Sequence, residues 1–121
     1  MILALVDDLM FTSKIRATAG PLGAEVLFAR SKDAALAEMA KAAPALVIMD
    51  LNSPRIDSLG VVAAMRADPA LTGTPIVAFV SHVHTELIDR ARAAGITEVL
   101  PRSAFTMRLA EILRDGAGPT A

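Results

Sequence analysis

The sequence predicts an α/β fold, in which a parallel five-stranded sheet is covered by helices on both faces. Helix-like and strand-like segments alternate along all 121 residues. The strand-like segments are short and mostly apolar, as strands buried on both faces of a parallel sheet are. Glycine, proline and capping residues separate the segments. This alternation is typical of successive βα units, which together build a three-layer sandwich.

Five short, mainly apolar runs are the expected strands. Residues 2–6 read ILALV and residues 46–49 read LVIM, and neither run contains a polar side chain. Because these runs are too short for a buried helix, a strand is the better interpretation. We expect strands at residues 2–6, 24–28, 45–49, 76–80 and 98–100.

The segments between the strands carry the start and stop signals of helices. Gly20 and Pro21 are expected to stop the first helix, and Gly95 the fourth. Ser31 is expected to cap the second, because its hydroxyl can accept a hydrogen bond from the first turn. We expect helices at residues 12–19, 31–41, 58–67, 85–94 and 104–114.

Length and composition point to one folded domain. A chain of 121 residues is a normal single-domain length, and 54% of its residues are hydrophobic, which favours a buried core over disorder. The last residues read GAGPTA. We therefore expect one domain over residues 1–115 and a flexible C-terminal tail over residues 116–121.

Charge and residue usage exclude several classes of partner. The net charge is −1 and there is no Trp or Tyr, so we expect no nucleic-acid binding by this domain. No apolar stretch is long enough to cross a membrane, and we expect no membrane partner. The chain has no cysteine, which is compatible with a reducing compartment. We expect a cytoplasmic location.

Three aspartates stand at the ends of two expected strands. Asp7 and Asp8 follow the run at 2–6, and Asp50 follows the run at 45–49. The expected strand order is 2-1-3-4-5, the flavodoxin-like order, which makes these two strands neighbours at the point where ligands bind. Two carboxylates 4–5 Å apart repel by about 3–4 kcal/mol at an effective dielectric constant of 20. The cluster therefore requires a cation or shifted pKa values.

At these residues the chain resembles the receiver domain of two-component response regulators, and the resemblance covers nearly all of its length. Asp7 and Asp8 are similar to the family's acidic pair, and residues 48–57 (IMDLNSPRID) to its phosphoacceptor strand and loop. The resemblance implies that Asp50 accepts a phosphoryl group. It also implies a Mg²⁺ site formed by Asp7, Asp8, Asp50 and the backbone carbonyl of Asn52.

The resemblance also implies partners and a mode of action. The phosphoryl group would come from a sensor histidine kinase or a phosphotransfer protein, and phosphorylation would switch protein–protein interactions. The chain would not be an enzyme beyond Mg²⁺-dependent self-phosphorylation and dephosphorylation of Asp50. A homodimer could form through the face built from residues 85–94, Val99 and residues 104–114.

Four positions depart from the family pattern where the phosphoryl group would be sensed. Val80 stands where the family has Thr or Ser, so Ser81 is the remaining candidate hydroxyl donor. Val99 replaces the reporting aromatic residue, which makes Val80 and Val99 altered switch positions. Arg102 replaces a lysine and keeps its charge on a planar fork. Ser103 replaces the proline after that lysine, where a cis bond would cost roughly 2.5–4 kcal/mol without proline.

These departures leave a second function open. The chain could be a phosphorylation-independent pseudo-receiver that acts as a protein-interaction module. A flavin carrier is disfavoured because no phosphate-binding loop follows the first strand. An aspartyl phosphatase is disfavoured because Asp7-Asp8 is not the Asp-x-Asp pattern of that class. His82 and His84 are expected to be exposed loop residues rather than metal ligands.

Overall fold

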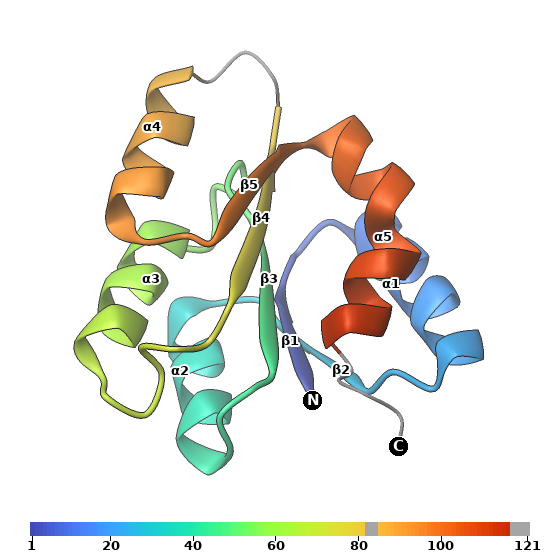
Figure 1. Ribbon diagram of the computed structural model, residues 1–121, viewed down its shortest axis with the longest axis horizontal. Coiled ribbons are helices and arrows are strands. Elements are labelled where there is room, and N and C mark those ends of the chain that lie inside the picture. Colours follow the sequence, from blue (N-terminus) through green and yellow to red (C-terminus); the bar gives the residue numbers. More distant parts are fainter. Residues whose placement is uncertain (82–84, 117–121) are drawn as a thin grey trace.

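A parallel sheet separates two layers of helices in the computed structural model, which describes residues 1–81 and 85–116 (Figure 1). Strands and helices alternate in the predicted way. In chain order they are β1 (Ile2–Leu5), α1 (Leu9–Leu22), β2 (Val26–Ala29), α2 (Lys32–Lys41), β3 (Leu46–Asp50), α3 (Ser58–Ala67), β4 (Ile76–Val80), α4 (Thr85–Ala94), β5 (Glu98–Pro101) and α5 (Arg102–Gly116).

The strand order is β2-β1-β3-β4-β5, and every neighbouring pair is parallel. The predicted flavodoxin-like order is therefore confirmed. In the register of β1 and β3, Leu5 lies opposite Met49. The aspartates that follow these two residues consequently leave the same end of the sheet.

Alternate residues of each strand enter two separate apolar cores. In β1, Ile2 and Ala4 pack with residues of α1 and α5, whereas Leu3 and Leu5 pack with residues of α2, α3 and α4. The period of two along a strand produces this division, because successive side chains point to opposite faces. Both faces of the sheet are thus covered, which fixes the strand ends as a rigid platform (Figure 1).

The first helix is longer than the sequence predicts at both ends. Asp8 caps it, so α1 begins directly afterwards, at Leu9 rather than Thr12. Pro21 lies inside its last turn, where the missing N–H removes a single hydrogen bond. Gly23 ends the helix with a left-handed φ of 66°, and its N–H bonds back to the carbonyls of Ala19 and Gly20. The predicted stop at Gly20-Pro21 is therefore wrong.

The last helix is also longer than expected, and this moves one predicted site residue onto a helix. Arg102 begins α5 directly after β5, although we predicted a loop there. No peptide bond in the described part of the chain is cis, including the one that follows Arg102. Gly116, which the sequence assigns to the tail, is the buried last residue of α5. A Cβ at Gly116 would collide with Leu46, so glycine allows this close approach. Residues 117–121 lie outside the described residues.

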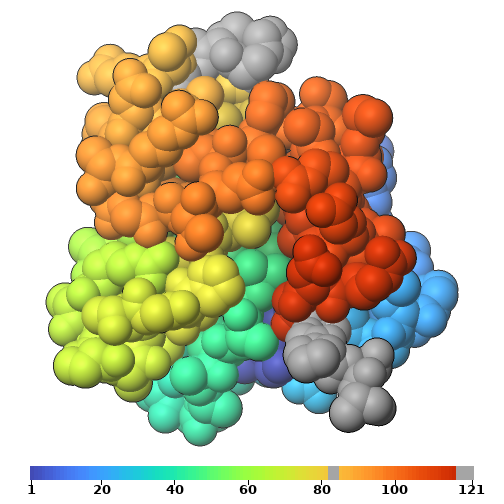
Figure 2. Space-filling view, viewed as in Figure 1, coloured from blue at the N-terminus to red at the C-terminus, as the bar shows by residue number. Residues whose placement is uncertain are grey.

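Other boundaries differ by one or two residues. Strand β2 begins at Val26 and ends at Ala29, whereas β3 runs one residue further than predicted and includes Asp50. Helix α4 and helix α5 flank the edge strand β5, and the three elements form one continuous face (Figure 2). Among the described residues, no helix is both long and apolar enough to cross a membrane.

Candidate functional site

The last residue of β3, Asp50, is the most deeply placed polar group at this end of the sheet. Only 3% of the residue is exposed. Its Oδ1 accepts a hydrogen bond of 2.8 Å from the backbone N–H of Asn52, which comes from the turn that follows the strand. The hydroxyl of Ser58, at the start of α3, donates to the Asp50 backbone carbonyl at 3.1 Å. The carboxylate is therefore fixed by the segment that immediately follows it.

The acidic pair after β1 is held by two different kinds of contact. Asp8 is the N-cap of α1, and its Oδ1 accepts hydrogen bonds from the N–H groups of Met10 (2.8 Å) and Phe11 (3.2 Å). Asp7 accepts a 2.9 Å hydrogen bond from the Ser53 hydroxyl across the crevice. Asp8 therefore caps α1 with one oxygen of its carboxylate. Ser53 joins the β3–α3 loop to the end of β1.

Burial raises the pKa of the Asp50 carboxyl above its ordinary value. The hydrogen bond from Asn52 and the positive charge of Arg102 oppose this rise, whereas the negative charges of Asp7 and Asp8 add to it. The three carboxylates thus interact electrostatically across the crevice. A cation placed among them would remove the repulsion and favour the ionised form of Asp50.

The oxygen ligands of this site suit a hard divalent cation, although the side chains of Asp7 and Asp8 accept hydrogen bonds from the protein here. Carboxylate and carbonyl oxygens are the ligands that Mg²⁺ takes from proteins. Within residues 1–81 and 85–116, no three acidic or histidine side chains are gathered as a metal-binding group. Each carboxylate has a second oxygen, so Asp8 can cap α1 and still offer a ligand. His82 and His84, which we expected to be exposed loop residues, lie outside the described residues.

The ends of β4 and β5 form the other half of the crevice, and this half is mostly apolar. Val80 ends β4 fully buried, and Val99 in β5 is also buried. Both belong to the core that packs against α3 and α4. The backbone N–H of Ser81 donates to the Asn52 side-chain oxygen at 2.6 Å. This contact ties the end of β4 to the loop after β3, while the hydroxyl of Ser81 stays a candidate donor.

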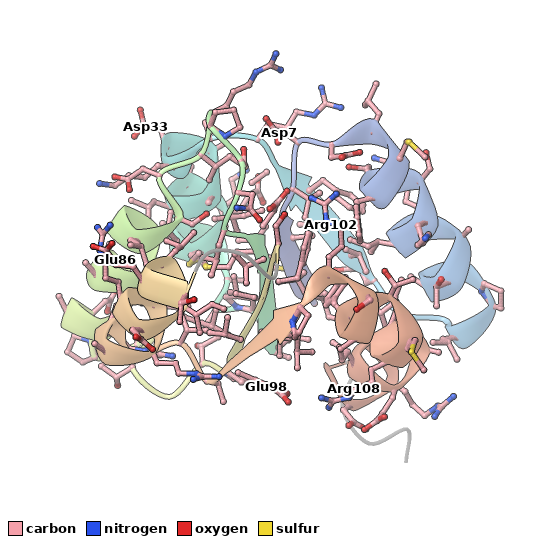
Figure 3. The ribbon with its side chains drawn as sticks, turned by 90° about the horizontal axis from the view of Figure 1, so that it is seen from above. Asp7, Asp33, Glu86, Glu98, Arg102 and Arg108 are labelled. Carbon is pink, nitrogen blue, oxygen red and sulfur yellow. The ribbon has the colours of Figure 1, made fainter. Side chains whose placement is uncertain are left out.

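Arg102 is the cation of this half of the crevice. Its Nη2 lies 3.9 Å from Oδ2 of Asp50, at the outer limit of an ion pair, and 42% of its side chain is exposed. The guanidinium carbon is 4.8 Å from the centre of the Phe11 ring. Figure 3, which looks onto the carboxyl ends of the strands, shows Arg102 and Asp7 at this end of the sheet. Arg102 thus stands between an aromatic ring and the buried carboxylate.

Three residues of the site were missed by the sequence interpretation. Ser53 holds Asp7, Ser58 holds the Asp50 carbonyl, and Phe11 lies under Arg102. Ser58 stands at the expected start of the helix at residues 58–67, which was a usable signal for the second contact. Phe11 gave a weaker signal, as one of only four aromatic residues in the chain.

The chain is similar to the family described as the response regulator receiver domain, over residues 2–114. Among curated proteins, none matches the chain. The chemotaxis response regulator CheY4 of Vibrio cholerae is 26% identical, with a TM-score of 0.81 over 94% of this chain and 95% of its own. A response regulator protein from Burkholderia multivorans is 30% identical, with a TM-score of 0.76 over 99% and 96%. The Mn²⁺-bound form of the response regulator Rcp1 is 19% identical, with a TM-score of 0.76 over 94% and 88%.

The chain therefore belongs to the response regulator receiver domain family, and the predicted family and fold are confirmed. It is a receiver domain of two-component signal transduction. Proteins of this family are generally not enzymes, and they interact with histidine kinases or phosphotransfer proteins. Metal binding at the phosphorylation site is a general property of the family as well.

Proposed function

We propose that Asp50 of this receiver domain accepts a phosphoryl group from a phosphohistidine partner or from a small acyl phosphate. One observation carries the proposal: Asp50 is a buried carboxylate with one oxygen held by Asn52 and the other facing Arg102. A carboxylate placed in this way can act as a nucleophile. Its free oxygen bonds to phosphorus, the bond from phosphorus to the donor atom breaks, and the donor leaves with that electron pair. The product is an acyl phosphate on Asp50.

We infer that Mg²⁺ is the metal of this site, held by Asp7, Asp8, Asp50 and the backbone carbonyl of Asn52. The mutual repulsion of the carboxylates, which adds to the raised pKa of Asp50, supports a cation here. A neighbour of the same fold was solved with Mn²⁺. When bound, the ion neutralises the charge that develops on the phosphoryl oxygens. Ser53 orients Asp7, and the Asp8 cap fixes the start of α1 beside the nucleophile.

The negative charge of the phosphoryl group has to be stabilised by groups of the chain itself. Phosphorylation adds about −1.5 to −2 charges at neutral pH. Arg102 is the nearest cation to Asp50 and has a fork of N–H donors that suits phosphoryl oxygens. Val80 has no hydroxyl to offer, and the Ser81 N–H is bonded to Asn52. We therefore assign stabilisation of the phosphoryl charge mainly to Arg102, with Ser81 as a secondary donor.

The output is a change in protein–protein contacts, in keeping with a receiver domain that acts in the cytoplasm. The face formed by α4, β5 and α5 is our candidate for a homodimer or partner surface. Val80 and Val99 cannot couple a hydroxyl to an aromatic side chain. Any switching therefore proceeds through Arg102, Ser81 or the backbone at the end of β4. The sensor kinase or phosphotransfer protein is the expected donor.

The alternative, a pseudo-receiver that works without phosphate, is not favoured. Its support is Val80 and Val99, whereas the complete acid set opposes it. A buried carboxylate whose pKa is raised by burial, and further by two neighbouring acids, is typical of a functional site rather than of an inert module.

Intact-mass measurement tests the proposal. The protein is incubated with Mg²⁺ and acetyl phosphate, beside Asp50→Asn and, as a matched control, Asp33→Asn, which removes an exposed carboxylate from the first turn of α2. We expect one phosphoryl adduct on the wild type and on Asp33→Asn, and none on Asp50→Asn. A wild-type protein that binds Mg²⁺ but takes no phosphoryl group would contradict the proposal and favour the pseudo-receiver.

A further inference from the structure

Arg102 lies on a stack of three phenylalanine rings. The centres of Phe11 and Phe79 are 4.7 Å apart with 20° between the ring planes, and those of Phe79 and Phe105 are 4.5 Å apart with 30°. The guanidinium carbon of Arg102 is 4.8 Å from the centre of Phe11 and 5.8 Å from that of Phe79. These rings come from α1, β4 and α5, so the stack joins three elements at the crevice.

Hydrogen bonds do not explain where the Arg102 side chain lies. Among the described residues, its buried Nε has no hydrogen-bond partner. The approach of Nη2 to Asp50 is 3.9 Å, which is longer than a hydrogen bond. Besides this loose ion pair, the guanidinium therefore has the Phe11 ring as an attractive partner, because cations are attracted to the face of an aromatic ring.

The surroundings of Arg102 leave it room to move sideways. A pocket of about 400 Å³ on one side is lined by Ser81, Pro101, Arg102 and Ser103. A smaller pocket of about 140 Å³ on the other side is lined by Asp8, Met10, Phe11, Lys14 and Arg102. A long side chain between two pockets keeps one orientation only if something fixes its plane.

We propose that Phe11 is a positioning residue, which holds the guanidinium of Arg102 over its ring and aims the Nη atoms at Asp50. This inference rests on the proposed function only for its effect on phosphorylation. The arrangement also accounts for arginine at this position, because a planar guanidinium stacks on a ring and still presents N–H donors at its edge. A lysine ammonium has no plane for the ring to orient.

The chain contains a matched control for this contact. Phe28 in β2 carries the guanidinium of Arg16 at 4.7 Å from its ring centre, nearly the distance found for Phe11 and Arg102. Phe28 packs against the same core as Phe11 but lies on the edge strand β2. Phe28→Leu therefore removes an equivalent ring–arginine contact without touching the crevice.

The first experiment records the Nε–H signals of the arginines by NMR, in the protein without phosphodonor. The Arg102 signal is assigned by its absence in Arg102→Lys. We expect Phe11→Leu to move this signal toward that of a free arginine, because the ring-current shift is lost, and Phe11→Tyr to retain it. Phe28→Leu is expected to move the Arg16 signal instead. An Arg102 signal that does not move in Phe11→Leu would overturn the positioning role, whether or not Asp50 is phosphorylated.

The second experiment measures the rate of phosphorylation by acetyl phosphate. We expect Phe11→Leu to lower it about 3- to 10-fold, since a cation–ring contact of this kind is modest. Phe11→Tyr restores the rate, and Phe28→Leu leaves it unchanged. In the Arg102→Ala background, Phe11→Leu has no further effect if Phe11 acts through Arg102. An equal loss in both backgrounds would show a merely structural role. A wild type that takes no phosphate would defeat the proposed function, while the NMR result would still decide the positioning role.

Discussion

The two halves of the strand-end crevice are built in different ways. At the ends of β1 and β3, Asp8 and Asp50 bond to backbone N–H groups two or three residues further along the chain. In the half built by β4 and β5, Val80 at the end of β4 and Val99, two residues before the end of β5, are buried in the core. The charge of that half comes from the single long side chain of Arg102, which lies over Phe11.

In our proposal, this difference separates the nucleophile, Asp50, from Arg102, which would bind the phosphoryl group. In the acidic half, Asp8 and Asp50 are fixed by local turns, and only Asp7 depends on a contact with a distant residue, Ser53. The opposite half depends on contacts between distant elements, so it can change by single substitutions. A receiver domain can in this way keep its phosphoryl chemistry while its response to phosphorylation is altered.

The acidic half is expected to give the largest effect. Asp8→Asn removes a charge from the proposed Mg²⁺ site but keeps the cap of α1, because Asn caps helices as well as Asp does. We expect this variant, or removal of Mg²⁺ by EDTA, to slow phosphorylation by acetyl phosphate at least about 100-fold. Intact-mass time courses measure the rate. A rate that does not depend on Mg²⁺ would contradict the metal assignment.

Removal of the Arg102 charge is expected to have a smaller effect. Arg102→Ala should lower the phosphorylation rate about 10- to 100-fold, the range for a lost hydrogen bond to a charged group. Arg102→Lys should recover only part of the loss. Arg108→Ala, which removes a cation of α5 that pairs with Glu98 and Glu111, is the control and should have no effect. An unchanged rate for Arg102→Ala would contradict this role of Arg102. Stabilisation of the phosphoryl charge would then fall to Ser81 and the metal.

Restoration of a hydroxyl at the end of β4 would make the two halves more alike. We expect Val80→Thr to change the phosphorylation rate about 2- to 10-fold, as one neutral hydrogen bond allows. The buried hydroxyl should also lower the free energy of unfolding by about 1–3 kcal/mol. Val77→Thr, at a buried position of the same strand, should show the stability loss alone. An identical rate for the two variants would mean that a hydroxyl at position 80 does not contact the phosphoryl group.

The smallest expected effect concerns stability and pH. Because burial raises the pKa of Asp50, the folded protein keeps this proton to a higher pH than the unfolded chain does. The resulting stability is present below the ordinary carboxyl pKa and is lost as pH rises through the raised pKa. Asp50→Asn should therefore raise the free energy of unfolding and the Tm at neutral pH.

Thermal melts across the acidic to neutral range measure this effect. The difference in Tm between the wild type and Asp50→Asn should grow with pH, and Mg²⁺ should stabilise the wild type more than the variant. The prediction would be contradicted by a wild type that becomes more stable than Asp50→Asn with rising pH in the absence of Mg²⁺. In that case, Asn52 and Arg102 would stabilise the carboxylate by more than burial destabilises it.

The fold could be predicted from the sequence because its signals are local. Five short apolar runs with helical segments between them predict a parallel sheet built from βα units, and Asp8, Ser31 and Asp57 are all helix caps. The end of the first helix was mispredicted at Pro21 because a proline in the last turn costs little, while Gly23 provides the actual stop. A helix start at Arg102 was missed because its signal lies in packing rather than in a capping residue.

The candidate site was predictable to a similar extent. Asp7, Asp8 and Asp50 stand at strand ends in the sequence itself, so their common position follows from the strand order. The contact of Phe11 with Arg102 joins residues from two ends of the chain, and its geometry depends on how three rings stack. No pattern of spacing encodes such a contact.

The most direct test of the central claim identifies the atom that carries the phosphoryl group. After incubation with Mg²⁺ and acetyl phosphate, borohydride reduces an acyl phosphate to an alcohol, which converts the modified aspartate to homoserine. Peptide mass spectrometry then locates it. We predict homoserine at Asp50 alone. Homoserine at Asp7, Asp8 or any other aspartate, or its absence from a protein that has bound Mg²⁺, would contradict the account.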